Sequence, residues 1–377
     1  MRLILALIMT IACSFSAFAE PDALVCAAHQ CVAVVDAGSS GSRLHIYVYD
    51  RDQDNSTYNI HELYNQKIKV GISNLELDSG VFNQYLSNLM SKATVKNLPI
   101  YFYATAGMRL IPNQDQQRRY QLITNWFAAH PEWQVKEIKT ITGQEEGKFG
   151  WLALAETRYQ HNEDVSSLGV MDMGGASIQV TFPASREDSL NNMDKVSVNF
   201  HGQKVNLFIH SFLGLGQTEV LHQYLTDQAC FPQTYPLPDG VIATGDAAQC
   251  KDDMINLING VHHVNEIVKP ILKDSTVNHW SVIGGIAYMV NLPPFQFTDN
   301  QFTPETLFNQ GKTEVCNADW SMLSATYPDN ENLFAACLYS SYFSSLVVEG
   351  YGLLQNTAIN YLPASQSDWS MGVVLTL

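Results

Sequence analysis

Two segments of the chain share one order of residue types, and that order suits the binding of a phosphate with a metal ion. Each has an apolar run, an aspartate, a turn of glycine and serine, and a second apolar run; they are residues 34–43 and 169–179. Glycine lets the backbone bring its N–H groups close to an anion. Asp36 and Asp172 would repel a phosphate unless a divalent cation lay between them. The two segments therefore predict a clamp for a polyphosphate and its metal.

Hydrolysis of a terminal phosphate also needs a base for the proton of the attacking water. Glu145 and Glu146 stand where a predicted strand meets a helix, and either carboxylate could serve. Favourable interaction with the helix dipole is the alternative explanation of this acidic pair. Four other side chains near the turns could neutralise phosphate or hold the water: Arg43, Arg109, Ser177 and Gln179.

The elements that must position these residues repeat in two halves. Residues 32–39 and 43–50 predict a hairpin, followed by strands at 58–70, 100–103 and 135–141 and helices at 79–93, 114–129 and 148–159. The second half predicts strands at 168–171, 178–182, 195–200, 205–211 and 280–283. It predicts a helix that follows Gly214-Leu215-Gly216 and runs to about 227, and further helices at 252–272 and 333–354. Residues 369–375 predict a final strand or packing segment. This repetition implies an internal duplication, and hence an α/β fold with two lobes and a ligand cleft between them.

The charge balance excludes some partners. The chain has 377 residues, with 21 basic and 37 acidic side chains and a formal charge of −16. Nucleic acid polymers and anionic membranes select basic surfaces, so neither is expected as a partner. An anionic substrate would need a local site of backbone amides, metal and arginine. The sequence leaves the oligomeric state open.

The N-terminus predicts export. Arg2 precedes an apolar run that ends in Ala17-Phe18-Ala19, which is typical of a signal peptide over residues 1–19; an uncleaved anchor is the alternative. We expect no later membrane span and a secreted or periplasmic location. Six cysteines follow the run, and an even number in an exported chain predicts disulfides. Pairing of sequence neighbours gives Cys26–Cys31, Cys230–Cys250 and Cys316–Cys337.

Together these segments resemble the apyrase family, the nucleoside triphosphate diphosphohydrolases related to the cell-surface ecto-ATPase CD39. Five short regions recur in that family in a fixed order, and similar segments occur here at residues 36–43, 104–109, 142–147, 172–179 and 369–372. The resemblance implies two RNase H-like lobes of the actin, Hsp70 and hexokinase type. Lobe I would span residues 32–162 and be completed by 355–377, with lobe II at 163–354. Cell-surface relatives carry spanning helices at both ends, so this chain resembles a soluble, bacterial-type form.

The resemblance also implies an activity and the residues that perform it. The activity is removal of the terminal phosphate from nucleoside tri- and diphosphates with Ca²⁺ or Mg²⁺. Glu146 would be the base, because the family places it directly before the glycine of the third region. Asp36 and Asp172 would hold the water shell of the metal, and Ser177 with Gln179 would orient the attacking water. The residues around the phosphates would be Ser39, Ser40, Gly41, Ser42, Arg43, Thr105, Arg109, Gly174, Gly175 and Ala176.

The long apolar helix carries three aromatic residues, Tyr342, Phe343 and Tyr351. Aromatic residues on such a helix ordinarily belong to the hydrophobic core, but one of them could stack on a nucleobase. Two other functions stay open. An exopolyphosphatase or guanosine pentaphosphate phosphatase shares the fold and the pair of glutamates, but the export signal, the cysteines and Gly107-Met108-Arg109 favour an apyrase. A non-catalytic nucleotide-binding switch is disfavoured because a candidate base is present.

Overall fold

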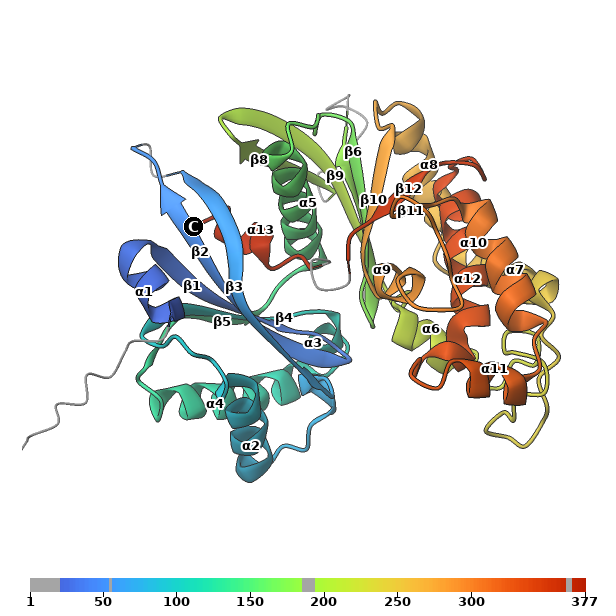
Figure 1. Cartoon of the computed structure of the whole chain (residues 1–377), viewed down its shortest axis with the longest axis horizontal. Helices are drawn as coiled ribbons and strands as arrows, with labels where there is room; N and C mark the ends of the chain where they lie inside the picture. Colours follow the sequence, from blue (N-terminus) through green and yellow to red (C-terminus); the bar gives the residue numbers. More distant parts are fainter. Residues whose placement is uncertain (1–20, 54–55, 185–193, 364–367) are drawn as a thin grey trace, which may run out of the picture.

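The computed structural model describes residues 21–53, 56–184, 194–363 and 368–377, which form two mixed β-sheets with helices around them (Figure 1). The predicted signal peptide, residues 1–19, lies outside the described residues. Each sheet forms the centre of one lobe, so the predicted α/β architecture with two lobes is confirmed.

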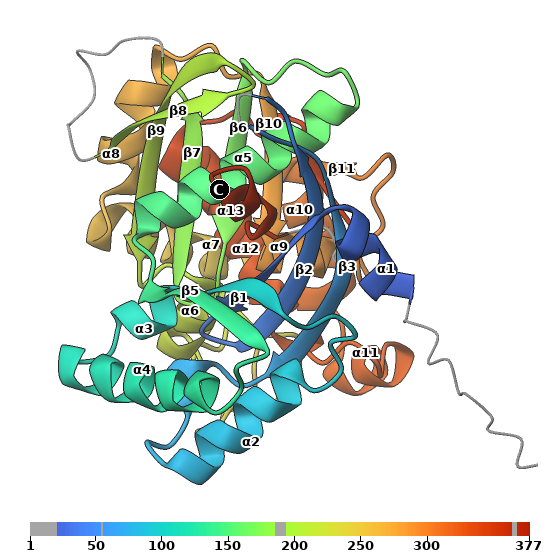
Figure 2. The same cartoon turned by 90° about the vertical axis from the view of Figure 1, so that its left-hand side faces the viewer.

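The first lobe begins with the hairpin that carries the first glycine–serine turn. Its strands are β1 (Gln30–Ala37), β2 (Gly41–Arg51), β3 (Thr57–Lys69), β4 (Leu98–Ala104) and β5 (Trp133–Thr140), in the order β3-β2-β1-β4-β5. Its helices are α1 (Pro21–Ala28), α2 (Ser79–Met90), α3 (Ala106–Arg109) and α4 (Asn113–Ala128). Phe82 and Ile123 share one apolar cluster with Phe102 of β4, and α2 and α4 cover one face of the sheet (Figure 2).

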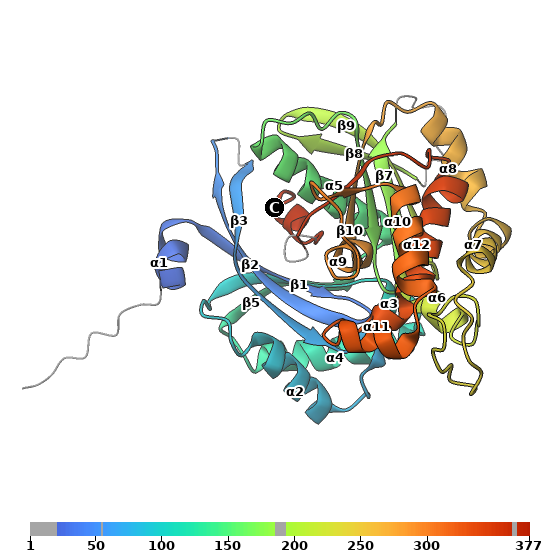
Figure 3. The same ribbon diagram turned by 45° about the vertical axis from the view of Figure 1, so that its right-hand side comes forward.

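The second lobe is larger and carries the second turn. Its strands are β6 (Leu168–Met173), β7 (Ser177–Pro183), β8 (Lys195–Phe200), β9 (Gln203–Leu213), β10 (His279–Gly284), β11 (Gln301–Phe302) and β12 (Ile359–Tyr361), in the order β11-β12-β10-β6-β7-β9-β8. Its helices are α6 (Gln217–Gln223), α7 (Ala247–Ile255), α8 (Val264–Lys273), α9 (Gly285–Val290), α10 (Pro304–Gln310), α11 (Trp320–Thr326) and α12 (Ala336–Ser345) (Figure 3).

The two sheets repeat the same strand pattern. β1 and β2 pair antiparallel while β4 lies parallel to β1 on its other side. In the second sheet β6 and β7 pair antiparallel while β10 lies parallel to β6. Every residue of β6 and β7 is buried, as expected for central strands covered on both faces. The pattern places each glycine–serine turn between the first two strands of its lobe.

Helix α5 (Gly143–Gln160) lies between the lobes and packs against both sheets (Figure 1). Phe149 and Leu152 of α5 share one apolar cluster with Val34 of β1 and Ile209 of β9. The last helix, α13 (Met371–Val374), packs along α5, and Gly372 approaches the backbone of Phe149 closely. The C-terminal segment is thus a bridge between the lobes.

Several element boundaries differ from the sequence prediction. α5 begins at Gly143 rather than near 148, because Thr142 and Glu145 form a reciprocal capping box. The helix predicted over 252–272 is interrupted at His263, which is left-handed. Residues 369–375 are a packing segment with a short helix and not a strand. The sequence prediction assigned residues 355–377 to lobe I. Strand β12, within this segment, pairs instead with β10 of the second sheet, so the prediction is wrong for this strand.

The long apolar helical segment, Leu333–Tyr351, is by length and composition sufficient to cross a membrane. The sequence alone predicts no such stretch after the N-terminus. In the described part of the chain this segment is 83% buried, as a core helix is, and it packs within the second lobe.

The three predicted disulfides are all formed. Cys26–Cys31 links α1 to β1, Cys230–Cys250 ties the loop after α6 to α7, and Cys316–Cys337 joins α12 to the end of the helical segment Gly311–Cys316. Disulfides persist in oxidising compartments, so their presence supports a non-cytosolic location.

Candidate active site

The two glycine–serine turns meet at Ser39. A Cβ atom placed on Gly175 of the second turn would lie 2.2 Å from Ser39 Oγ, and one on Gly107, at the start of α3, would lie 2.8 Å from Ser39 Cα. Only glycine permits such close approach at these two positions. The first, second and fourth regions of the sequence motif are therefore in direct contact, as the clamp hypothesis requires.

A buried polar cluster lies beside the turns and contains the candidate base. Glu146, in the first turn of α5, is 3% exposed and accepts hydrogen bonds from the Arg109 guanidinium and from Gln179 Nε2, the latter at 3.1 Å. Gln179 Nε2 also lies 2.7 Å from Ser177 Oγ and 2.9 Å from Ser211 Oγ. Ser211 receives a further hydrogen bond from Arg109 at 3.3 Å. Helix α5 and strands β7 and β9 thus bring these side chains together.

The two adjacent glutamates have different surroundings. Burial raises the pKa of Glu146, although the positive charge of Arg109 opposes the change. A carboxylate with a raised pKa is a better proton acceptor near neutral pH. Glu145 instead accepts from the Thr142 backbone N–H at 2.8 Å and from Lys139 Nζ at 3.0 Å, so it caps the helix. The structure therefore distinguishes two residues that the spacing alone left equivalent.

Asp36 and Asp172 are the next-to-last residues of β1 and β6 and are both enclosed. Within the described residues, Asp36 Oδ1 and Asp172 Oδ2 are buried without a hydrogen-bond partner. Burial and the charge of Asp368 raise the pKa of Asp36 to about 8. Burial and the charge of Glu146 raise the pKa of Asp172 well above its usual range. Buried carboxylate oxygens that lack donors and repel one another suit a divalent cation, so these residues fit the metal role.

The described residues contain no group of three or more His, Cys, Asp or Glu side chains that could hold a metal ion directly. Asp36 and Asp172 come from different lobes, and each offers one donor-free oxygen. Contact through the water shell of a cation would need fewer direct ligands.

Beside Asp36 lies a charged network that the sequence analysis missed. Arg43 Nη1 donates to Asp368 Oδ2 at 3.2 Å, and His45 Nε2 lies 3.2 Å from the same oxygen. The other nitrogen of His45, Nδ1, lies 2.5 Å from Glu62 Oε1. His45 is 2% exposed and Asp368 is enclosed with it. The network joins β2 and β3 to the C-terminal segment.

The remaining predicted phosphate-binding residues lie in the turns or at their ends. Ser42 is fully buried and receives a hydrogen bond from the Tyr85 hydroxyl at 2.7 Å, which leaves it engaged in the lobe interior. The others occupy the turn after β1, the first residue of β2, the start of α3 and the turn between β6 and β7: Ser39, Ser40, Gly41, Thr105, Gly174, Gly175 and Ala176.

The three aromatic residues proposed for base stacking are not at this site. Tyr342 and Phe343 have no exposed surface and Tyr351 is 1% exposed, and all three belong to the core of the second lobe. The Tyr342 hydroxyl donates to the Leu215 carbonyl at 2.6 Å, which is an interior contact. A ring with no exposed face cannot stack on a nucleobase, so the prediction that one of these three residues stacks on the base is wrong.

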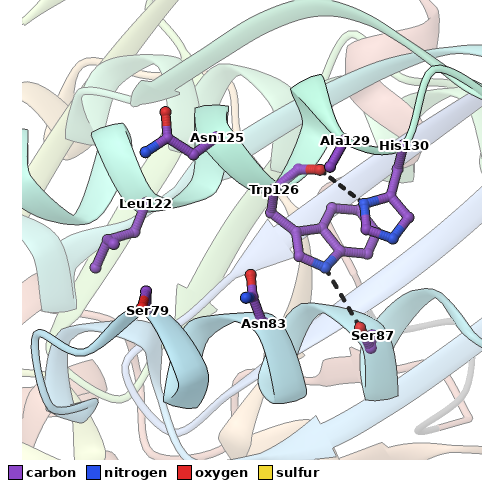
Figure 4. Close-up of a pocket in the computed structure, with 8 residues that line it drawn as sticks. All are labelled: Ser79, Asn83, Ser87, Leu122, Asn125, Trp126, Ala129 and His130. Atoms are coloured by element: carbon purple, nitrogen blue, oxygen red, sulfur yellow. Dashed lines mark hydrogen bonds between the residues drawn. The ribbon is translucent and has the colours of Figure 1, made fainter.

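A separate hollow of about 410 Å³ lies between α2 and α4 (Figure 4). Trp126 Nε1 donates to Ser87 Oγ at 3.3 Å, and the ring of His130 stacks on Trp126 with 3.8 Å between centroids. The lining contains no lysine, arginine or carboxylate: Ser79, Asn83, Ser87, Leu122, Asn125, Trp126, Ala129 and His130. This hollow lacks the charges that a phosphate–metal complex requires.

Known proteins share both the sequence and the fold. The model of the GDA1/CD39 (nucleoside phosphatase) family matches residues 25–377. The chain is 27% identical to ectonucleoside triphosphate diphosphohydrolase 8 of Gallus gallus, over 91% of this chain and 82% of the relative. It is 26% identical to the Golgi apyrase of Schizosaccharomyces pombe, over 86% of this chain and 68% of the relative.

Two solved structures share the fold at 14% identity. One is a nucleoside triphosphate hydrolase structure from Neospora caninum, with a TM-score of 0.60 and 92% of each chain covered. The other is a Ppx/GppA family member from Aquifex aeolicus, with a TM-score of 0.56, covering 92% of this chain and 96% of that one. Since the family model matches residues 25–377, the chain belongs to the GDA1/CD39 (nucleoside phosphatase) family.

Proposed function

We propose that this nucleoside phosphatase releases the terminal phosphate of nucleoside tri- and diphosphates, with Glu146 as general base. The observation that carries the proposal is the buried cluster of Glu146, Gln179 and Ser177 next to the two glycine–serine turns. A phosphate held by the turns would present its phosphorus to a water held by this cluster. The relatives named as triphosphate diphosphohydrolases and apyrases support the substrate class.

The roles of the side chains follow from their hydrogen-bonding capacity. Gln179 Oε1 is buried without a partner within the described residues, so it is free to accept a hydrogen bond from the attacking water. The Ser177 hydroxyl lies 2.7 Å from the amide nitrogen of Gln179 and would hold the same water. Glu146 takes the proton, and its raised pKa favours that transfer. Arg109 fixes the carboxylate of Glu146 in position.

Ca²⁺ or Mg²⁺ is the proposed cofactor, held through its water shell by Asp36 and Asp172. When bound, the cation neutralises charge on the phosphate oxygens. The two carboxylates carry unpartnered buried oxygens, and burial together with acidic neighbours raises their pKa values although Arg43 opposes the change, as a cation site would require. Backbone N–H groups of the turns would complete the phosphate contacts.

The proposed location is the outside of the cell or the periplasm. Three disulfides and the predicted signal peptide support it, and the names of the relatives refer to ecto-enzymes and to a Golgi apyrase.

Phosphate release from a panel of substrates tests the proposal. The panel contains ATP, ADP, UDP, long-chain polyphosphate and guanosine pentaphosphate, each with Ca²⁺ and with Mg²⁺. We expect release from the nucleoside tri- and diphosphates and at least about a hundredfold lower kcat/KM for polyphosphate, as a site that recognises the nucleoside would give. Release from polyphosphate or guanosine pentaphosphate alone would contradict the proposal and favour the exopolyphosphatase alternative.

A further inference from the structure

Three charged residues form a row across the first sheet. Asp36 of β1 lies directly opposite Arg43 of β2, and Arg43 lies directly opposite Lys67 of β3. Directly opposite residues of antiparallel strands project from the same face of a sheet, with Cβ atoms about 5 Å apart. Lys67 therefore projects from the face that carries Asp36 and Arg43, one strand further toward the edge.

Lys67 also reaches the second lobe. Its ammonium lies 5.6 Å from the ring centroid of Tyr288, on α9, and Tyr288 is 42% exposed. Helix α9 follows Gly284, where a Cβ atom would lie 2.9 Å from Asp172 Oδ1. The lysine thus spans the two lobes beside the turns that carry Asp36 and Asp172.

Lys67 differs from its neighbours in its partners. Arg43 is engaged by Asp368, and Lys69, two residues along β3, forms an ion pair with Glu331 of the second lobe. Among the described residues, no carboxylate lies within ion-pair distance of Lys67. Its ammonium contacts the Tyr288 ring, and a cation–π contact at an exposed site is weak.

Two cations side by side create a place for an anion. Partial desolvation lowers the pKa of Lys67 and the positive charge of Arg43 lowers it further, while the negative charges of Asp36 and Asp368 oppose the change. A bound anion would relieve this repulsion, and a chain with a formal charge of −16 needs local cations of this kind to attract an anionic substrate. A lysine ammonium binds phosphate as a point charge on a flexible stem.

We propose that Lys67 is a further substrate-binding residue, whose ammonium leaves the Tyr288 ring and binds a phosphate oxygen of the nucleotide. This inference rests on the proposed function, because it takes the nucleoside di- or triphosphate as the ligand. In this proposal Lys67, at the outer end of the row Asp36–Arg43–Lys67, contacts the phosphate chain beside the proposed metal site. Lys67 would act in binding and not in proton transfer.

The test replaces the charge and keeps the length of the stem. Lys67→Met removes the ammonium, Lys67→Arg retains a positive charge, and Lys69→Met is the matched control on the same strand. Titration calorimetry with a non-hydrolysable ATP analogue and Mg²⁺ measures binding without turnover. We expect Lys67→Met to weaken binding about tenfold or more, which is the effect of losing one charge-assisted contact. Lys67→Arg should recover most of the affinity, and Lys69→Met should stay within about threefold of wild type.

The outcomes separate this inference from the proposed function. Binding by Lys67→Met equal to wild type, or an equal loss in Lys69→Met, would overturn the role of Lys67. Absence of phosphate release by the wild-type protein from every nucleotide would instead overturn the proposed function. A smaller dependence of binding on salt concentration in Lys67→Met than in Lys69→Met would support the loss of a specific phosphate contact.

Discussion

His45 connects the first lobe to the C-terminal segment, and its replacement should change how stability depends on pH. Both ring nitrogens face carboxylates, with Nδ1 2.5 Å from Glu62 Oε1 and Nε2 3.2 Å from Asp368 Oδ2. A neutral imidazole carries a single N–H, and two carboxylates at ion-pair distance favour the protonated ring. We therefore expect the folded protein to hold His45 as a cation.

The magnitude follows from the pKa shift. Burial lowers the pKa of His45, but the charge of Asp368 and the hydrogen bonds to Asp368 and Glu62 outweigh it and raise the pKa to about 10. The ordinary value is 6.5, and each pKa unit corresponds to about 1.4 kcal/mol, so the interaction contributes at most about 5 kcal/mol. Because the folded pKa is the higher one, this contribution is complete below about pH 6.5 and is lost as the pH rises toward 10.

Urea unfolding of wild type and His45→Gln between pH 6.5 and 9.5 measures this contribution. Since the slope is about 1.4 kcal/mol per pH unit for one proton, we expect the stability advantage of wild type to shrink by about 3–4 kcal/mol over this range. His61→Gln, which removes an exposed imidazole from β3, is the control. A difference between wild type and His45→Gln that is the same at every pH would refute a cationic His45 in the folded state.

Three other perturbations have expected outcomes. Gly372→Ala should lower the free energy of unfolding by about 1–3 kcal/mol in urea, because its Cβ would lie 2.0 Å from the Phe149 carbonyl oxygen; unchanged stability would contradict that close packing. Ser177→Ala should lower kcat about 10- to 100-fold with little change in KM, and a change in KM alone would place Ser177 in ground-state binding instead of water positioning. Excess EDTA should abolish phosphate release, and added Ca²⁺ or Mg²⁺ should restore it; full activity in EDTA would remove the cation from the mechanism.

The sequence predicted the parts of the fold and site that local patterns encode. The repeated strand–turn–strand segments identified both sheets and both turns, because alternating apolar runs and glycine–serine turns are local signals. The neighbouring cysteines paired as expected. The start of α5 was placed too late, although the signal was present: Thr142 followed by Glu145 is a capping box.

The parts that were missed depend on contacts between distant segments. Asp368 and His45 are more than 300 residues apart in sequence, and no local sequence pattern predicts their pairing. Ser211 joins the catalytic cluster only because β9 lies beside β7, where it pairs opposite Gln179. Tyr342 and Phe343 were considered for base stacking because of their residue type, but whether a helix face meets solvent or core is decided by tertiary packing.

The role of Glu146 is tested most directly by Glu146→Gln, with Glu145→Gln as the matched control. Glutamine keeps the size of the side chain and its contact with Arg109 and cannot accept the proton of water. Single-turnover phosphate release from ATP, measured after binding is saturated, reports the chemical step alone.

We expect Glu146→Gln to slow that step by more than about a hundredfold, as the loss of a general base does, while nucleotide affinity changes little. Glu145→Gln should release phosphate within a few-fold of the wild-type rate. A Glu146→Gln rate close to that of wild type, or an equal loss in Glu145→Gln, would contradict the assignment of Glu146 as the base.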